Sequence, residues 1–233
     1  MSDHLPANDI EPIISPIIHS VSMSERTGKA MNVRADVRKL CSNALSYGAI
    51  KAAPISARKI VVDPRVRLKC AIPVCDSYGR CLMCPPNIMS VEAFESALEM
   101  YQVAIVIQFE ITMDKKKMEG KICSMQLAKL RLDNDYDAML TESMRAMSMA
   151  LINLERDALH LGYRFTAALS AGNCRLCDEC VGPGSGKQCR HPFEARPAAE
   201  AMGVDVFATA ANAGMPIEFP AKRPVWTCIL LVD

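Results

Sequence analysis

The segment YRFTAALSAGNCRLCDECVGPGSGKQCRHP, residues 163–192, decides how this chain is organised. Its first part, residues 163–171, predicts a β-strand, and the rest is a glycine-rich loop with four cysteines. A strand that leads straight into such a loop predicts a ligand site at the end of a sheet. The cysteines of this second cysteine loop (residues 172–191) are Cys174, Cys177, Cys180 and Cys189.

The spacing of these four cysteines favours an iron–sulfur cluster. Three of them form a C-x2-C-x2-C run, which lets a short loop supply three corners of a [4Fe–4S] cluster, and Cys189 supplies the fourth ligand from further along. Structural zinc more often uses two C-x2-C pairs with a longer connection, so zinc is the alternative. We interpret His191 as a polar loop residue or a donor to a cluster sulfur, because four cysteines already complete the site.

A first cysteine loop (residues 70–86) carries a second, less regular set with the spacing C-x4-C-x5-C-x2-C. Iron–sulfur ligation is again favoured, with zinc as the alternative. The ending Cys84-Pro85 resembles that of bacterial ferredoxin motifs, in which the cysteine before proline ligates the other cluster. The sequence therefore leaves ligation across the two loops open. The cysteines of the first loop are Cys70, Cys75, Cys81 and Cys84.

The remaining three of the eleven cysteines, Cys41, Cys123 and Cys228, stand alone and are predicted to be small buried hydrophobic residues. A disulfide framework is not expected, because the chain is long and shows no secretory signal. The 27 basic and 26 acidic residues nearly cancel, which argues against a basic nucleic-acid binder. No apolar stretch reaches the length of a membrane span. We expect a cytoplasmic protein without a membrane or nucleic-acid partner.

The rest of the chain predicts an α/β or α+β domain, a layered sheet with flanking helices and both cysteine loops at strand ends. The first 33 residues are expected to form a flexible arm, and residues 34–233 a single metal-binding domain. A stripe from Leu140 to Leu161 predicts one long helix. Further helices are expected over residues 36–47, from Ser90 onward, and over 197–202 and 206–213, and further strands over 57–62, 103–109 and 224–232.

Three longer motifs carry a resemblance to a known family: RCLMCPP, SAGNCRLCDEC and CRHPFEARPAAEAMGVDVFATAANAGM. With these motifs the chain resembles a family of cysteine-rich, predicted metal-binding proteins of anaerobic bacteria and archaea, from about Ile60 to Asp233. The resemblance implies iron or another metal at both sets of cysteines and a cytoplasmic, oxygen-poor setting. It implies no agreed reaction.

Three functions follow from the cysteines. The first is an electron-transfer protein with two [4Fe–4S] clusters that passes single electrons to a partner redox enzyme, or takes them from an electron donor, in anaerobic metabolism. The chain would then be an accessory redox protein rather than a stand-alone enzyme. The second is an iron–sulfur enzyme or metalloenzyme activation factor with one open cluster site, in which Arg65, Arg67, Tyr78 and Arg80 could serve a substrate. The third is a zinc-stapled interaction domain.

Overall fold

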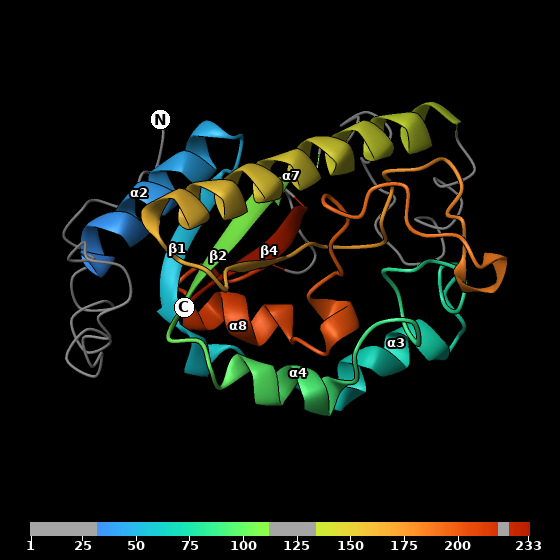
Figure 1. The fold of residues 1–233 in the computed structure, drawn as a ribbon, viewed down its shortest axis with the longest axis horizontal. Coiled ribbons are helices and arrows are strands. Elements are labelled where there is room, and N and C mark those ends of the chain that lie inside the picture. Colours follow the sequence, from blue (N-terminus) through green and yellow to red (C-terminus); the bar gives the residue numbers. More distant parts are fainter. Residues whose placement is uncertain (1–31, 112–133, 219–223) are drawn as a thin grey trace.

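The structure is a computed structural model that describes residues 32–111, 134–218 and 224–233. It has the layered α+β architecture that the sequence predicts, with one four-stranded sheet between helices (Figure 1). The described helices are α2 (Val33–Ser46), α3 (Leu68–Ala71), α4 (Val91–Leu98), α7 (Asn134–Leu161) and α8 (Val206–Asn212). The strands are β1 (Lys51–Ser56), β2 (Val103–Glu110), β3 (Ala167–Leu169) and β4 (Val225–Val232). Short 3-10 turns are η1 (Ala57–Lys59), η2 (Pro64–Arg67), η3 (Pro183–Ser185) and η4 (Glu200–Met202).

The sheet has the strand order β1-β2-β4-β3, and each neighbouring pair is antiparallel. The two central strands pair along their whole length, from Val103 opposite Val232 to Glu110 opposite Val225. Both are continuous apolar runs because helices cover both faces of the sheet. The strands β1 and β3, which precede the two cysteine loops in the chain, lie at opposite edges of the sheet and are not neighbours.

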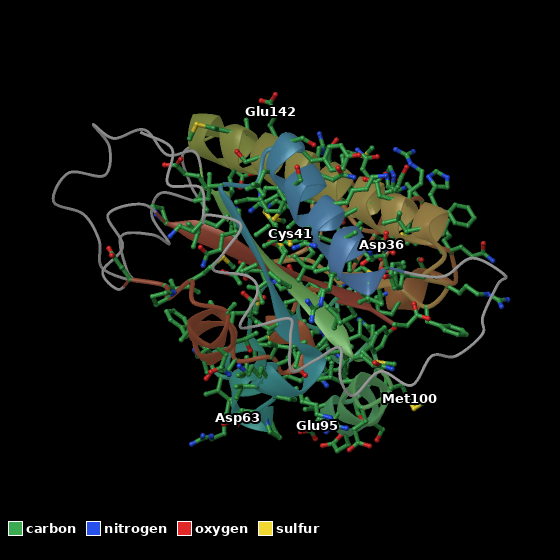
Figure 2. The ribbon with its side chains drawn as sticks, turned by 90° about the vertical axis from the view of Figure 1, so that its left-hand side faces the viewer. Asp36, Cys41, Asp63, Glu95, Met100 and Glu142 are labelled. Atoms are coloured by element: carbon green, nitrogen blue, oxygen red, sulfur yellow. The ribbon has the colours of Figure 1, made fainter. Side chains whose placement is uncertain are left out.

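Two hydrophobic cores lie on opposite faces of the sheet. Helices α2 and α7 cover one face, where Ile105 and Leu230 point toward the helices, and α4 and α8 lie on the other, where Val106 and Ile229 are buried (Figure 1). Cys41 belongs to the first core and lies on the side of α2 that faces the sheet (Figure 2). The alternation of β2 side chains between the two cores follows from the two-residue period of a strand.

Most of the predicted elements are confirmed, and their ends have the expected chemistry. Ser90 caps α4 by accepting a hydrogen bond from the Ala93 N–H, at 3.1 Å. The chain leaves α2 at Gly48 and α7 at Gly162, with φ of +99° and +106°. Glycine adopts these positive values without a steric penalty. The long apolar stripe forms α7, and α8 and β4 lie within one or two residues of their predicted ranges.

Three local predictions are wrong. Residues 57–62 do not form a strand: the strand is β1, and Val62 makes only an isolated bridge to Val204. The strand predicted over residues 163–171 shortens to β3, because Ser170 pairs with Ala198 instead. The helix predicted over residues 197–202 is reduced to η4.

These differences contradict the expectation that both cysteine loops begin at the end of a strand. Only the second loop follows a strand directly, since η1, η2 and the start of α3 separate β1 from Cys70.

Several expectations fall on residues outside the described ranges. The arm predicted for residues 1–33 is described only at its last two residues, where Asn32 caps α2 through the Ala35 N–H and Val33 begins the helix. Cys123 also lies outside the described residues. Among the helices that are described, none combines the length and the apolar character needed to cross a membrane.

Candidate metal centre

The second cysteine loop leaves the sheet at Gly172. This residue has a φ of +67°, and a Cβ atom there would lie 3.0 Å from the Met144 side chain and 3.4 Å from the Trp226 ring. Glycine therefore lets the chain turn from β3 along α7 without a steric conflict. The turn delivers Cys174 to the end of the sheet, two residues later.

Helix α7 holds the second loop in place through two arginines. Arg175 of the loop donates to Asp137 at 2.7 Å and to the Thr141 hydroxyl at 2.9 Å, both on α7. In the opposite direction, Arg145 of α7 donates to the Arg175 carbonyl and to the Asp178 carboxylate, each at 3.0 Å. The cysteine run is thus anchored on both sides of Cys177 by the same helix.

The first cysteine loop is held by its own backbone. The Cys75 N–H donates to the Cys70 carbonyl at 2.9 Å, and the Cys84 N–H donates to the Cys81 carbonyl at 3.1 Å. Gly79, with a φ of +68°, donates to the Pro85 carbonyl at 2.8 Å and closes the loop. This local network presents Cys81 and Cys84 inward, where their exposed fractions are 6% and 8%.

The two loops meet at Cys81. Its sulfur accepts hydrogen bonds from the thiols of Cys84 in its own loop and of Cys174 and Cys180 in the other. The backbones approach as well, because a Cβ atom on Gly182 would lie 3.4 Å from the Arg80 carbonyl oxygen. Figure 1 shows the second loop beside α3 and the first loop, beyond the end of the sheet.

These contacts shift the pKa values of the thiols in opposite directions. The pKa of Cys81 is lowered, chiefly by the hydrogen bonds from Cys174 and Cys84, and the Met83 N–H adds to the effect. The pKa of Cys84 and that of Cys174 are raised, first because each donates its thiol proton to Cys81 and then because each is buried. Of these thiols, Cys81 is therefore the one that loses its proton most readily in the metal-free chain.

The other four loop cysteines are partly exposed. Burial raises the pKa of Cys70, and the negative charge of Cys75 raises it further. The His191 backbone N–H donates to the Cys189 sulfur at 3.4 Å, while the His191 ring pairs with Glu194 at 2.6 Å. The Nδ1 atom of the ring is therefore engaged with Glu194, and the interpretation of His191 as a loop residue rather than a ligand stays a prediction.

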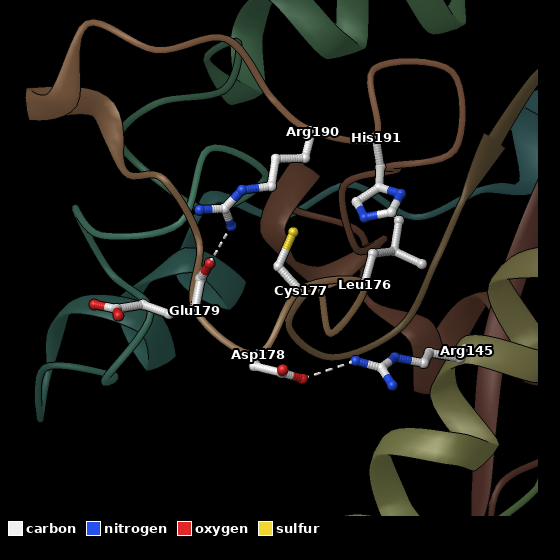
Figure 3. Close-up of a pocket in the computed structure, with 7 residues that line it drawn as sticks. All are labelled: Arg145, Leu176, Cys177, Asp178, Glu179, Arg190 and His191. Carbon is white, nitrogen blue, oxygen red and sulfur yellow. Dashed lines mark hydrogen bonds and ion pairs between the residues drawn. The ribbon is translucent and has the colours of Figure 1, made fainter.

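Cys177 opens onto a shallow cavity of about 410 Å³ at the surface of the second loop. Figure 3 shows its sulfur pointing between Arg190 and His191, with Arg145 at the edge of the cavity. Arg190 donates to the Glu179 carbonyl at 2.8 Å and so stays beside the opening. One loop cysteine thus faces a solvent-accessible cavity that carries two guanidinium groups.

A buried carboxylate lies between the two loops. Glu200, in η4, accepts a hydrogen bond from the Gly172 N–H and interacts electrostatically with Cys70. Its Oε2 atom is buried and has no hydrogen-bond partner among the described residues. Burial raises the pKa of Glu200, and the positive charge of Lys69 opposes this effect. No sequence motif marks Glu200, because its position depends on the bridge that pairs Ser170 with Ala198.

Two of the four residues considered for a substrate near the first loop, Arg65 and Arg67, make contacts elsewhere. The Arg65 guanidinium donates to both carboxylate oxygens of Asp63, from Nε to Oδ1 at 3.0 Å and from Nη2 to Oδ2 at 2.5 Å, and its side chain is 84% exposed. Arg67 donates to the Met89 carbonyl at 3.4 Å. These contacts give no support to a substrate site there.

The donor chemistry of the loops fits a soft metal. Eight thiols within two adjoining loops match zinc or iron–sulfur clusters and not the oxygen-seeking cations. Within the described part of the chain, no three His, Cys, Asp or Glu side chains are arranged around a single point that would hold one ion. The thiols contact each other through Cys81 instead, so metal uptake must exchange thiol hydrogen bonds for metal–sulfur bonds and release protons.

Fold and loops together define an α+β domain with a cysteine-rich end beyond the sheet. The chain belongs to the family described as "Predicted metal-binding protein (DUF2284)", whose model matches residues 53–232. This range includes all eight loop cysteines and leaves α2 outside. A search of curated proteins and a search of solved structures each returned no match. The description of the family supports the expectation of metal binding and does not specify the metal.

Proposed function

We propose that this chain holds two [4Fe–4S] clusters with its eight loop cysteines and serves as an electron carrier for a partner redox enzyme. The observation that carries the proposal is the meeting of the two loops, in which Cys81 of one loop contacts Cys174 and Cys180 of the other. Four thiolates complete one [4Fe–4S] cluster, so eight in adjoining loops suffice for two. Bound in this way, each cluster supplies a one-electron couple.

The surroundings of the cysteines support electron transfer over substrate chemistry. Backbone N–H groups reach the ligand sulfurs, from Met83 to Cys81 and from His191 to Cys189. Such hydrogen bonds raise the reduction potential of a cluster. The cavity at Cys177 brings one ligand to the surface, where a partner could approach. Ligation by cysteine alone also leaves no coordination position for a substrate.

The test is a metal analysis of protein purified without oxygen. We expect about eight irons and eight sulfides per chain, and a visible absorption band that dithionite bleaches. Replacing Cys177 by alanine should remove about four irons. Replacing Cys41, which is buried in α2 and far from the loops in the sequence, should leave the iron content unchanged and is the matched control. Iron-free protein, or a cluster that dithionite does not reduce, would contradict the proposal.

One observation favours a second candidate, a zinc-stapled interaction domain. Cys81 and Cys84 form a C-x2-C pair, and Cys81 contacts two further cysteines from a distant loop. A C-x2-C pair completed by two distant ligands is a common layout for structural zinc. About two zincs per chain in a colourless protein would establish this candidate and exclude the redox function.

A further inference from the structure

The cysteines form two sets in the sequence, but the contacts in the structure group them differently. By sequence, Cys81 belongs with the other cysteines of the first loop and Cys174 with those of the second. In the structure, the Cys81 sulfur makes hydrogen bonds with one thiol of its own loop and with two thiols of the other loop. The loop boundaries are therefore not the boundaries of the thiol cluster.

The backbone fixes Cys81 in this position. Its N–H donates to the Ser77 carbonyl at 3.1 Å, and its carbonyl accepts from the Cys84 N–H and from the Asn87 side chain, at 3.1 and 3.0 Å. Cys81 and Cys84 are also the two most buried of the loop cysteines. They face inward as a pair because this turn is closed on both sides.

The second loop is brought to this pair by independent contacts. Arg175 ties the loop to α7 directly after Cys174, and the glycine at position 182 lets the backbone pass the Arg80 carbonyl two residues after Cys180. Cys174 and Cys180 are thus held at two ends of one short segment. Both thiols are directed at the same sulfur.

We propose that Cys81, Cys84, Cys174 and Cys180 form one metal-binding set shared by the two loops. The other four loop cysteines then remain for the second centre. This assignment rests on the proposed metal binding but not on the metal being iron. It makes the metal a covalent tie between segments more than 90 residues apart in the sequence (Cys174 minus Cys81 is 93).

The test compares metal content in single and double variants of the full chain. If the set is shared, Cys81→Ala and Cys174→Ala damage the same centre, so the double variant keeps about half of the wild-type metal, as each single variant does. If the loops bind metal separately, the double variant loses both centres and holds almost none, which would overturn the proposal. The double variant Cys81→Ala with Cys84→Ala is the matched reference, since both assignments place these two cysteines in one centre.

A second measurement is independent of metal loading and of the stability of the variants. The wild-type chain, stripped of metal, is treated briefly with diamide, which accepts two electrons and two protons as two thiols form a disulfide. Peptide mapping should then find Cys81 or Cys84 joined to Cys174 or Cys180. Disulfides that join these four cysteines to cysteines outside the set would overturn the shared set. Failure of the wild type to bind any metal would overturn the proposed function, whereas the disulfide map would still decide which thiols are in contact.

Discussion

Replacing Glu155 by alanine should destabilise the domain more than any change on its surface. Glu155 lies on α7 and is 8% exposed. Its Oε1 atom accepts from the Ala168 N–H of β3 at 2.6 Å and from Arg196 Nε at 2.9 Å. Its Oε2 atom accepts from Arg196 Nε at 3.0 Å and from the same guanidinium through Nη2. One carboxylate thus joins a helix, a strand and the segment that follows the second cysteine loop.

The expected loss of stability is set by the polar groups that Glu155→Ala leaves without a partner. Breaking a buried ion pair by removing one partner costs about 3–5 kcal/mol, because the other charge stays buried. The Arg196 side chain is 23% exposed, so water screens part of its charge and the lower end of that range applies. The Ala168 N–H also loses its acceptor, a loss of about 1–3 kcal/mol that overlaps with the first term. We expect a total of about 3 kcal/mol.

The assay is urea unfolding of the reduced, metal-free chain, followed by circular dichroism. Glu142→Ala is the matched control, because Glu142 lies on the same helix and points outward (Figure 2). The control should change the free energy of unfolding by less than about 0.5 kcal/mol. The double variant with Arg196→Met should be more stable than the two single losses predict, since neither charge is then stranded. A loss below about 1 kcal/mol for Glu155→Ala would refute this account of the ion pair.

Three further predictions follow from the site. Gly172→Ala should destabilise the chain by about 1–2 kcal/mol in urea unfolding, because alanine is strained at a positive φ and its Cβ would press on Met144. Burial raises the pKa of Glu200, so its contribution to stability is complete below the unfolded pKa and is lost as the pH rises through the folded pKa. Glu200→Gln should therefore reduce the fall in stability that begins as the pH rises above the unfolded value of about 4.3. Removing the metal with a chelator should lower the thermal midpoint by about 10 °C or more, since a ligand at 1,000 times its Kd adds about 4 kcal/mol.

The elements with strong local signals were predictable from the sequence. The apolar run of β2 gives a buried strand because β2 lies between β1 and β4 and is covered on both faces. The strand predicted over residues 57–62 was wrong because the prediction relied on the high β-propensity of Ile60, Val61 and Val62. The strand is instead β1, which contains Pro54. Proline is tolerated there because β1 is an edge strand and its missing N–H removes no ladder bond.

The candidate ligands were also predictable, but their grouping was not. Spacing within a loop identifies cysteines that can bind metal together, whereas the approach of Cys81 to Cys174 depends on the paths of two loops far apart in the chain. The side chains that hold the second loop in its path do not belong to a recognisable sequence motif. Arg145 binds a backbone carbonyl 30 residues away, and Arg196 reaches a glutamate 41 residues before it. Such contacts are fixed by tertiary packing and leave no local periodicity.

The two cysteine loops are stabilised in different ways, and this difference has a consequence for metal binding. The first loop is closed by backbone hydrogen bonds of its own, whereas the second depends on α7 through Arg145 and Arg175 near its start and through the ion pair of Arg196 with Glu155 just after its end. A metal that takes ligands from both loops therefore couples a locally closed loop to a long helix. Its binding energy becomes folding energy for the α7 contacts as well. Loss of metal should consequently increase amide exchange in the part of α7 around Arg145 before it affects β2, whose hydrogen bonds lie in the centre of the sheet.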